Sequence, residues 1–244
     1  MNNKSLPISR TVTIIEFIVT IIVTINIDIV QGRIMMKIGI IGATGKAGQK
    51  LTQEAMKRGL DVTAIVRDAS KLTESVKVIE KNILQLTTED IKPFDVVINT
   101  FAAPLTDAEQ YRVMGKHLIS IFKDASTRLI VIGGAGRLFV DEISTTHLFD
   151  TPDFPEFLIS SSKNQYESYL ELKASSIKWT YVSPAAFFDP EGERTGNYAV
   201  GKDHLIFNSA GESYISYADL AVAIIDAAVN EQHLCAAITV VGEK

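Results

Sequence analysis

The sequence KIGIIGATGKAG, from Lys37 to Gly48, decides the fold, because a short apolar run leads directly into three glycines that open a helical pattern. Glycines with this spacing allow a tight turn, a close approach of backbone N–H groups to a phosphate, and close packing of the helix on the strand. The helix N-terminus adds partial positive charge. We therefore expect the loop to bind the pyrophosphate of a nicotinamide dinucleotide, through Gly42, Ala43, Thr44, Gly45, Lys46, Ala47 and Gly48.

The residues around the glycines complete a strand–helix–strand unit. Met36 to Ile41 is nearly continuous in apolar residues, as in a parallel strand buried on both faces. Lys46 to Arg58 has the apolar spacing of an amphipathic helix, Gly59 ends it, and Asp61 to Val66 is a second apolar run. Glycine triplets also occur in ordinary turns, but this context favours the dinucleotide site.

The rest of the chain alternates strand and helix patterns, which predicts a single α/β domain with a Rossmann-type, doubly wound, mostly parallel sheet over residues 36–244. Strands are expected at 37–41, 61–66, 76–80, 95–99, 128–132, 178–182 and 237–241. Helices are expected at 46–58, 107–124, 160–175 and 217–230, with shorter turns near 69–73 and 87–91. Residues 183–214 are rich in Pro, Gly and charge, and we expect a long excursion there, where a substrate would lie.

The composition indicates a globular protein of the reducing cytoplasm, a monomer or a homodimer that acts on a small molecule. The formal net charge of -5 argues against nucleic acid as the main partner, because phosphate binding needs a basic face. A single cysteine, Cys235, excludes a disulfide framework. The sequence has no Cys/His cluster at ligand spacing, so no metal site is expected.

The N-terminal residues 1–35 form an apolar extension that allows three interpretations. Thr11 to Val30 is about long enough to span a bilayer, but Glu16 and Asp28 would be costly there. A cleavable signal peptide would have small residues before its cleavage site, and the segment lacks them. We favour a third interpretation, in which the natural chain starts near Met35 or Met36 and the upstream sequence is read from a wrong start; a membrane anchor is less favoured.

The choice between NADPH and NADH depends on the end of the second strand. NAD-specific sites carry an acidic residue there for the ribose 2′-OH, whereas this strand ends in Arg67. A guanidinium suits a 2′-phosphate, so we expect NADPH, with NADH as the alternative; an Arg67–Asp68 pair would be the plain structural explanation. Asn82, after the third strand, is placed either to bind the adenine edge or to form a turn.

Small residues follow the later strands, at the edge where the cofactor would lie. The fourth strand leads into Thr100, Phe101 and Ala102, and the fifth into Gly133 and Gly134. Either run would let the backbone approach nicotinamide and ribose, or simply make a tight turn. Together with Pro184 at the end of the sixth strand, we count these residues as cofactor-binding.

The catalytic equipment of the short-chain dehydrogenases is incomplete in this chain. Those enzymes use a Tyr-x-x-x-Lys pair, in which the Lys lowers the pKa of the Tyr. Here Tyr169-x-x-x-Lys173 comes too late in its helix to face the nicotinamide, and no Ser follows the fifth strand. Lys163 is better placed and is the catalytic candidate, held by Glu167 one turn on; alternatively the two form an ordinary exposed ion pair.

A missing proton donor favours a conjugated acceptor, because a flavin, quinone or bilin takes hydride into its ring system and its proton from water. Phe187 and Phe188 could give an apolar shelf for such a ring, although aromatic pairs there are more often core. Arg194 is expected either to close on the substrate, with Gly196 as hinge, or to clamp the loop to Asp189 or Asp203.

Several blocks of sequence together resemble the NADH-flavin reductase group, an atypical short-chain dehydrogenase family similar to biliverdin reductase B and NmrA-like proteins. The blocks are Gly42–Gly48, Gly133–Gly136, Trp179–Pro184, Gly192–Gly196 with Gly201–Asp203, Ile215–Asp219 and Ile238–Val241. The resemblance implies a Rossmann fold, NAD(P)H binding and reduction of a flavin or quinone. The chain departs from it at Arg137, where relatives often have Ser, and in residues 1–35. A non-catalytic NmrA-like regulator is the alternative, and a lyase or epimerase is disfavoured.

Overall fold

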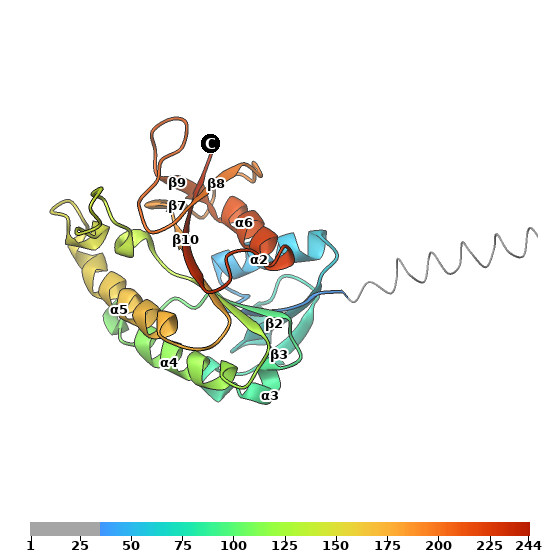
Figure 1. The fold of residues 1–244 in the computed structure, drawn as a ribbon. Helices are drawn as coiled ribbons and strands as arrows, with labels where there is room; N and C mark the ends of the chain where they lie inside the picture. The colour runs from blue at the N-terminus through green and yellow to red at the C-terminus, as the bar shows by residue number, and fades with distance from the viewer. Residues whose placement is uncertain (1–34) are drawn as a thin grey trace, which may run out of the picture. The chain divides into compact units, whose positions relative to one another are not determined.

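A computed structural model describes residues 35–244, whose centre is an eight-stranded sheet in the order β3-β2-β1-β4-β5-β6-β10-β8 (Figure 1). All neighbouring strands are parallel except β8, which runs antiparallel to β10. The strands are β1 (Lys37–Ile41), β2 (Asp61–Val66), β3 (Lys77–Glu80), β4 (Val96–Asn99), β5 (Arg128–Ile132), β6 (Trp179–Pro184), β8 (Tyr198–Gly201) and β10 (Ala236–Gly242). The predicted apolar extension lies, apart from Met35, outside the described residues.

Helices cover both faces of the sheet, as the predicted doubly wound fold requires. They are α2 (Lys46–Lys57), α3 (Thr88–Ile91), α4 (Gln110–Phe122), α5 (Glu156–Lys173) and α6 (Tyr217–Val229), with 3-10 helices η1 (Ala69–Lys71), η2 (Ile83–Gln85), η3 (Leu105–Asp107), η4 (Ala135–Arg137) and η5 (Leu148–Asp150). α2 and α6 pack together on one face, and α4 and α5 on the other. The mostly parallel α/β fold is therefore confirmed.

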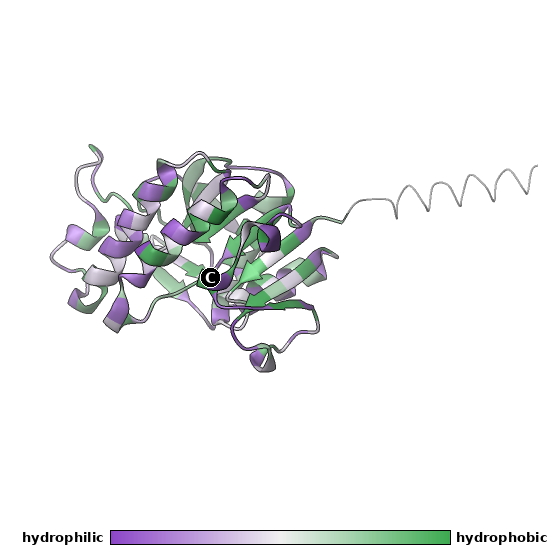
Figure 2. Ribbon diagram, turned by 90° about the horizontal axis from the view of Figure 1, so that it is seen from below, coloured by the Kyte–Doolittle hydropathy of each residue, from purple (hydrophilic) through white to green (hydrophobic). Residues whose placement is uncertain are grey.

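The core consists of two apolar layers, one on each side of the sheet. Successive strand side chains point to opposite faces, so Ile40 of β1 joins the layer under α2 and α6, and Ile41 the layer under α4 and α5. Figure 2 shows hydrophobic strands between helices whose outer faces are hydrophilic. Burying one Ile or Leu side chain contributes about 1.5–3 kcal/mol, and both layers draw on the near-continuous apolar runs that predicted the strands.

The region 183–214 contains more regular structure than expected. β7 (Phe187–Asp189) pairs in parallel with β9 (Tyr214–Ser216), and β8 adds an edge to the main sheet. Segments of three or four residues are too short to show a strand period, which is why the sequence pattern missed them. Within residues 35–244, no helix combines the length and the hydropathy that crossing a membrane requires.

Candidate functional site

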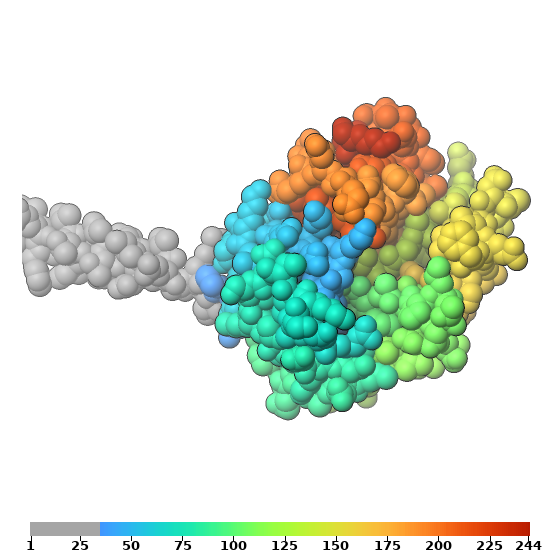
Figure 3. Space-filling view, turned by 180° about the vertical axis from the view of Figure 1, so that it is seen from behind, coloured from blue at the N-terminus to red at the C-terminus, as the bar shows by residue number. Residues whose placement is uncertain are grey.

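The predicted binding residues follow four neighbouring strands, at the carboxyl-end edge of the sheet. The order β2-β1-β4-β5 brings Arg67, the glycine loop, Thr100 and Gly133 into one row along that edge. The strand order reverses between β1 and β4, and ligands of open α/β sheets bind at such a switch point. In Figure 3 the blue segment that contains the glycine loop, together with orange, green and yellow segments, surrounds a hollow on this face.

Each of the three glycines in the loop is required, or tolerated, for a different structural reason. Gly42 has a φ of +80°, and a Cβ there would lie 2.7 Å from Oγ1 of Thr100. A Cβ on Gly48 would lie 2.2 Å from the carbonyl oxygen of Gly42, so the helix needs a glycine to pack on the turn. A Cβ on Gly45 would meet only that oxygen, at 3.3 Å. The second glycine is thus open on its outer side, as a pyrophosphate cradle requires.

The first turn of α2 offers unpaired donors beside this cradle. Its N-cap is Gly45, which has no side chain to cap the helix, and the turn contains no acidic residue. Within residues 35–244, the backbone N–H groups of Lys46 and Ala47 donate no hydrogen bond. Lys46 pairs with Glu191 at 3.0 Å, but both side chains are exposed, so the pair is weak. These donors fit a phosphate, whereas Ala43 is buried in the core.

Arg67 is exposed directly after β2, next to the glycine loop, because Gly42 N–H donates to the carbonyl oxygen of Ile65 at 2.9 Å. Among the described residues Arg67 has no ion-pair partner. The alternative pair with Asp68 is wrong, since Asp68 caps η1 and lies 3.4 Å from the ammonium of Lys71. A free guanidinium at this position matches the predicted contact with a 2′-phosphate.

Asn82 is a capping residue. Its side-chain oxygen accepts from Leu84 N–H at 3.0 Å, and Gln85 returns a bond to the backbone N–H of Asn82, also at 3.0 Å. This is the turn-forming role that the sequence left open. The side-chain oxygen of Asn82 is engaged in a hydrogen bond within the protein, so the predicted adenine contact is not supported.

Thr100 fastens the end of β4 to the glycine loop. Its hydroxyl donates to the carbonyl oxygen of Ile41 at 2.8 Å, and its backbone N–H bonds to the same oxygen at 3.1 Å. The predicted direct contact with the cofactor therefore becomes an indirect one, because Thr100 fixes the loop. Ala102 is exposed two residues on, while Pro184 is buried at the end of β6 and is not presented at the edge.

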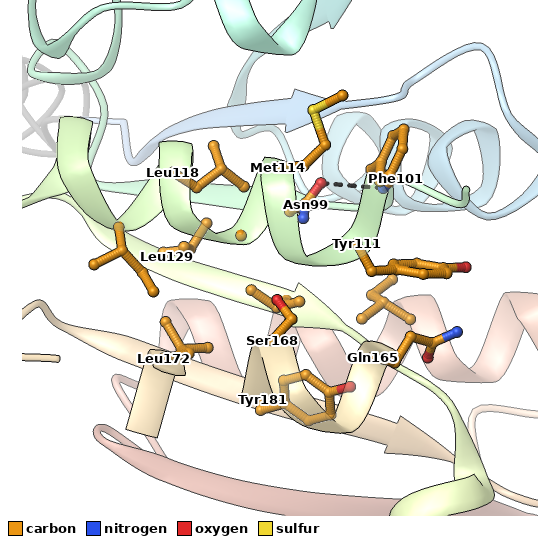
Figure 4. A pocket seen from close by; sticks show the side chains of 15 residues that line it. Asn99, Phe101, Tyr111, Met114, Leu118, Leu129, Gln165, Ser168, Leu172 and Tyr181 are labelled. Atoms are coloured by element: carbon orange, nitrogen blue, oxygen red, sulfur yellow. Dashed lines mark hydrogen bonds between the residues drawn. The ribbon is translucent and has the colours of Figure 1, made fainter. Parts of the chain in front are cut away.

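A narrow cavity lies behind this edge, between β4, β5, β6, α4 and α5 (Figure 4). Phe101, Tyr111 and Gln165 lie toward one end and leucines toward the other. Its volume is about 30 Å³, room for one or two waters. The rings of Phe101 and Tyr111 meet edge-on, with centroids 5.9 Å apart. Of these residues the sequence predicted only Phe101; Tyr111 and Gln165 carry no motif that could have revealed them.

The glycines after β5 accommodate side chains of the protein itself. A Cβ on Gly133 would lie 1.9 Å from the Tyr181 hydroxyl oxygen, and one on Gly134 would lie 2.9 Å from Oε1 of Gln165. We predicted glycines here so that the backbone could approach the cofactor. The structure shows instead that side chains of the protein occupy the space a Cβ would need. Their backbone still forms the β5 end of the row.

Lys163 is not brought to the cavity. Its ammonium lies 3.6 Å from the Asp150 carboxylate and 5.7 Å from the centre of the Phe149 ring, and it is about half exposed. The predicted partner, Glu167, is not the one the structure shows. The predicted catalytic role of Lys163 therefore has no support from the geometry.

Tyr169 is buried in the core, as expected for a Tyr-x-x-x-Lys pair out of register. Burial raises the pKa of its phenol, and the Arg137 guanidinium lies 4.8 Å from its ring centre. Arg137 is itself buried, and it donates to Ser183 at 2.9 Å and to Asp203 at 2.7 Å. The position where relatives often have Ser thus holds a buried structural cation, which the sequence did not reveal.

Phe187 and Phe188 do not form one shelf. They are neighbours in β7, so their rings point to opposite faces. Phe187 is 60% exposed, whereas Phe188 stacks on Tyr217 with ring centroids 3.7 Å apart. The predicted platform of two rings is therefore wrong. The two residues lie in a strand that the sequence did not reveal, and its geometry places their rings on opposite faces.

Arg194 binds Glu54 on α2, at 2.8 and 3.0 Å, instead of the predicted Asp189 or Asp203. Glu54 is 5% exposed and also accepts from Arg58 at 2.8 Å. The Arg194 hydrogen bond and, less strongly, Arg58 lower the pKa of Glu54 to about 2. Close by, Gly196 N–H donates to Asp219 at 2.7 Å. Arg194 is therefore a clamp, and its predicted substrate contact is not supported.

Comparisons with known proteins identify the family of the chain. The profile of a family described as NAD(P)H-binding matches residues 42–231. "Uncharacterized protein YwnB" of Bacillus subtilis is 54% identical over 211 residues, which is 85% of this chain and 99% of YwnB.

Two solved structures resemble the chain closely. SP1627 from Streptococcus pneumoniae, named "a putative NADH-flavin reductase", is 37% identical with a TM-score of 0.81, over 85% of this chain and 100% of that one. A "putative epimerase" from Bacteroides thetaiotaomicron is 34% identical with a TM-score of 0.77, over 86% and 98%. With the glycine cradle and the strand order, these matches show that the chain belongs to the NAD(P)H-binding family.

Proposed function

We propose that this protein is an NAD(P)H-dependent reductase that passes hydride to a flavin, a quinone or a similar conjugated acceptor. One observation carries the proposal: the glycine loop has the open backbone that a pyrophosphate cradle needs, while the Tyr of the Tyr-x-x-x-Lys pair, Tyr169, is packed in the core. The bound dinucleotide supplies the hydride. The acceptor gains that hydride and one proton, and the dinucleotide is left oxidised.

The proposed class of acceptor follows from the source of the proton that the acceptor gains. A ketone oxygen needs a proton donor in the transition state, whereas a conjugated ring system can take its proton from water. Burial raises the pKa of both Tyr169 and Tyr181, which makes either phenol a weaker acid. The cavity near the β5 end is lined mainly by apolar and aromatic side chains, but at about 30 Å³ it has no room for a planar ring, so the ring of the acceptor would lie outside it.

The preferred dinucleotide is NADPH. Arg67 is exposed, has no ion-pair partner among the described residues and follows β2, where a 2′-phosphate would lie. A guanidinium binds phosphate oxygens through a planar pair of donors and keeps its charge. NADH lacks this phosphate and gains nothing from the contact.

The test uses the full chain with NADPH or NADH and four acceptor classes: FMN, FAD, a small quinone, and a ketone. Loss of the dihydronicotinamide absorbance measures turnover. We expect oxidation with a flavin or the quinone and none with the ketone. Gly45→Asp is the matched control, because the fold has room at Gly45 while the added carboxylate blocks the phosphate.

Two outcomes would contradict the proposal. Dinucleotide binding without oxidation by any acceptor would favour the non-catalytic, NmrA-like alternative. Faster reduction of the ketone than of the quinone would mean that a proton donor exists at the site.

A further inference from the structure

The two sides of the crevice differ in charge. The glycine-loop side has Arg67, the open N-terminus of α2 and Lys46, whose charge is paired with Glu191. On the other side, residues 138–158 join η4 to the first turn of α5 and contain no Lys or Arg. We call this stretch the acidic rim segment, after its five carboxylates: Asp141, Glu142, Asp150, Asp153 and Glu156.

The acidic rim segment begins where the proposed acceptor would lie. It follows η4, the short helix that comes directly after Gly133 and Gly134, and its Phe149 ring lies 3.4 Å from where a Cβ on Gly136 would be. It ends in α5, whose Gln165 lines the cavity. Gln165 lies nine positions after Glu156 in the helix, about 14 Å at 1.5 Å per residue. Figure 1 shows the segment projecting beyond the first turn of α5.

The charge of this segment is little neutralised by the chain. Among the described residues, Asp150 is the only one of its carboxylates within 4 Å of a cationic group, at 3.6 Å from Lys163. Glu142 and Asp153 are exposed and take part in no hydrogen bond or ion pair within residues 35–244. The segment thus presents an uncompensated negative surface.

The same segment also exposes large apolar side chains. Ile143 is 79% exposed and Phe157 is 67% exposed, the two highest values among the large apolar residues that the structure describes. Phe187, the first residue of β7, adds a third apolar side chain, which is 60% exposed. An apolar and negative rim favours an apolar molecule without negative charge.

Building on the proposed function, we infer that the acceptor is an uncharged conjugated ring compound, and that Glu142 and Asp153 help to exclude its phosphorylated forms. A flavin phosphate would have to place two negative charges near the acidic rim segment, because the cationic groups of the glycine loop are taken by the dinucleotide. An uncharged ring meets no such repulsion. The reaction balances: dihydronicotinamide, a proton and the oxidised ring yield oxidised nicotinamide and the dihydro ring.

Riboflavin and FMN make the test, because they share one ring system and differ by the phosphate. We compare kcat/KM for the two with saturating NADPH. At an ionic strength of about 0.01 M, where charges act over about 30 Å, we expect riboflavin to be favoured roughly three- to tenfold. At about 1 M salt the charges are screened within about 3 Å, and the preference should fall to less than about twofold.

Charge reversal tests the named residues. The double variant Glu142→Lys/Asp153→Lys should raise kcat/KM for FMN at low salt and leave that for riboflavin unchanged. Asp124→Lys/Glu231→Lys is the matched control. It changes the net charge equally, but Asp124 lies four positions before β5 and Glu231 five positions before β10, so both are at the opposite edge of the sheet. Equal or better use of FMN by the native protein, or equal effects of the two double variants, would overturn the inference.

A binding measurement separates this inference from the proposed function. Quenching of flavin fluorescence gives the dissociation constants of riboflavin and FMN in the presence of saturating NADP⁺, with no turnover required. Absence of turnover would count against the proposed reductase. Tighter binding of riboflavin, lost at high salt, would still support the inference, and tighter binding of FMN would refute it.

Discussion

Replacing Gly48 and Gly45 by alanine, one at a time, should separate the structural and the binding roles of the glycine loop. In Gly48→Ala the new carbon would lie 2.2 Å from the Gly42 carbonyl oxygen and 2.7 Å from the Cα of Ala43. Ordinary contact begins at 3.4 Å, and both neighbours are backbone, so the helix must move about 1 Å away from the turn. Overpacking of this kind costs about 3 kcal/mol, the upper part of the usual range.

The direction of the change in stability distinguishes two explanations for Gly48→Ala. Helix propensity alone would make Gly48→Ala stabilising by about 1 kcal/mol, whereas the contact distances predict a Tm about 6–12 °C lower for a chain of this size. Gly45→Ala should lower Tm by less than about 3 °C, since its Cβ meets only one atom, at 3.3 Å. It should instead weaken NADPH binding about tenfold or more, because the backbone approaches the pyrophosphate there.

Thermal melting and an NADPH titration of both variants check this reasoning. Gly115→Ala is the control for a helical glycine, because its new Cβ would meet the Ser168 hydroxyl, a side chain that can rotate away. An unchanged or raised Tm for Gly48→Ala would refute the packing argument. Normal NADPH affinity in Gly45→Ala would refute the cradle.

Three further predictions follow from single residues. Arg67→Asp should weaken NADPH binding roughly 10- to 150-fold, the value of a charged hydrogen-bond contact of about 1.5–3 kcal/mol, and should change NADH binding far less; equal losses for the two would contradict the assignment. Because the pKa of Glu54 is lowered from 4.5 to about 2, its ion pairs should stabilise the fold fully above pH 4.5. That contribution, at most about 3 kcal/mol, should be lost as the pH falls toward 2, and a Glu54→Gln variant should lose this part of the pH dependence in urea unfolding curves. Tyr169→Phe should keep kcat within about twofold, since the ring is packed in the core and its hydroxyl bonds to no described residue; a loss of a hundredfold or more would restore the phenol as an acid.

The sequence was sufficient for those parts of the fold that depend on long, regular patterns. The seven parallel strands and the four long helices all lie within four residues of their expected bounds, because most of them bury a regular apolar face; β3, which has no buried residue, is an exception. β7, β8 and β9 escaped because three or four residues carry no usable period. Their absence from the prediction is what made Phe187 and Phe188 look like one aromatic shelf.

The sequence predicted which candidate residues gather at one edge of the sheet, but not the partners of their side chains. The glycine spacing is a local property, so the roles of Gly42 and Gly48 could be derived from neighbours in the chain. The partner of Arg194 lies 140 positions away, on α2, and no local pattern points to it. Gly133 was ambiguous for the same reason, since the ring that fills its side-chain space belongs to β6.

The clamp between Arg194 and Glu54 bears on the thermodynamics of binding. With Gly196 also bound to Asp219, the loop after β7 is held in place by contacts within the protein and needs no ligand to order it. A loop that is already ordered loses little conformational entropy when the dinucleotide arrives, whereas a closing flap would lose much of it. The affinity of the proposed glycine cradle would therefore not be reduced by an ordering cost in this loop.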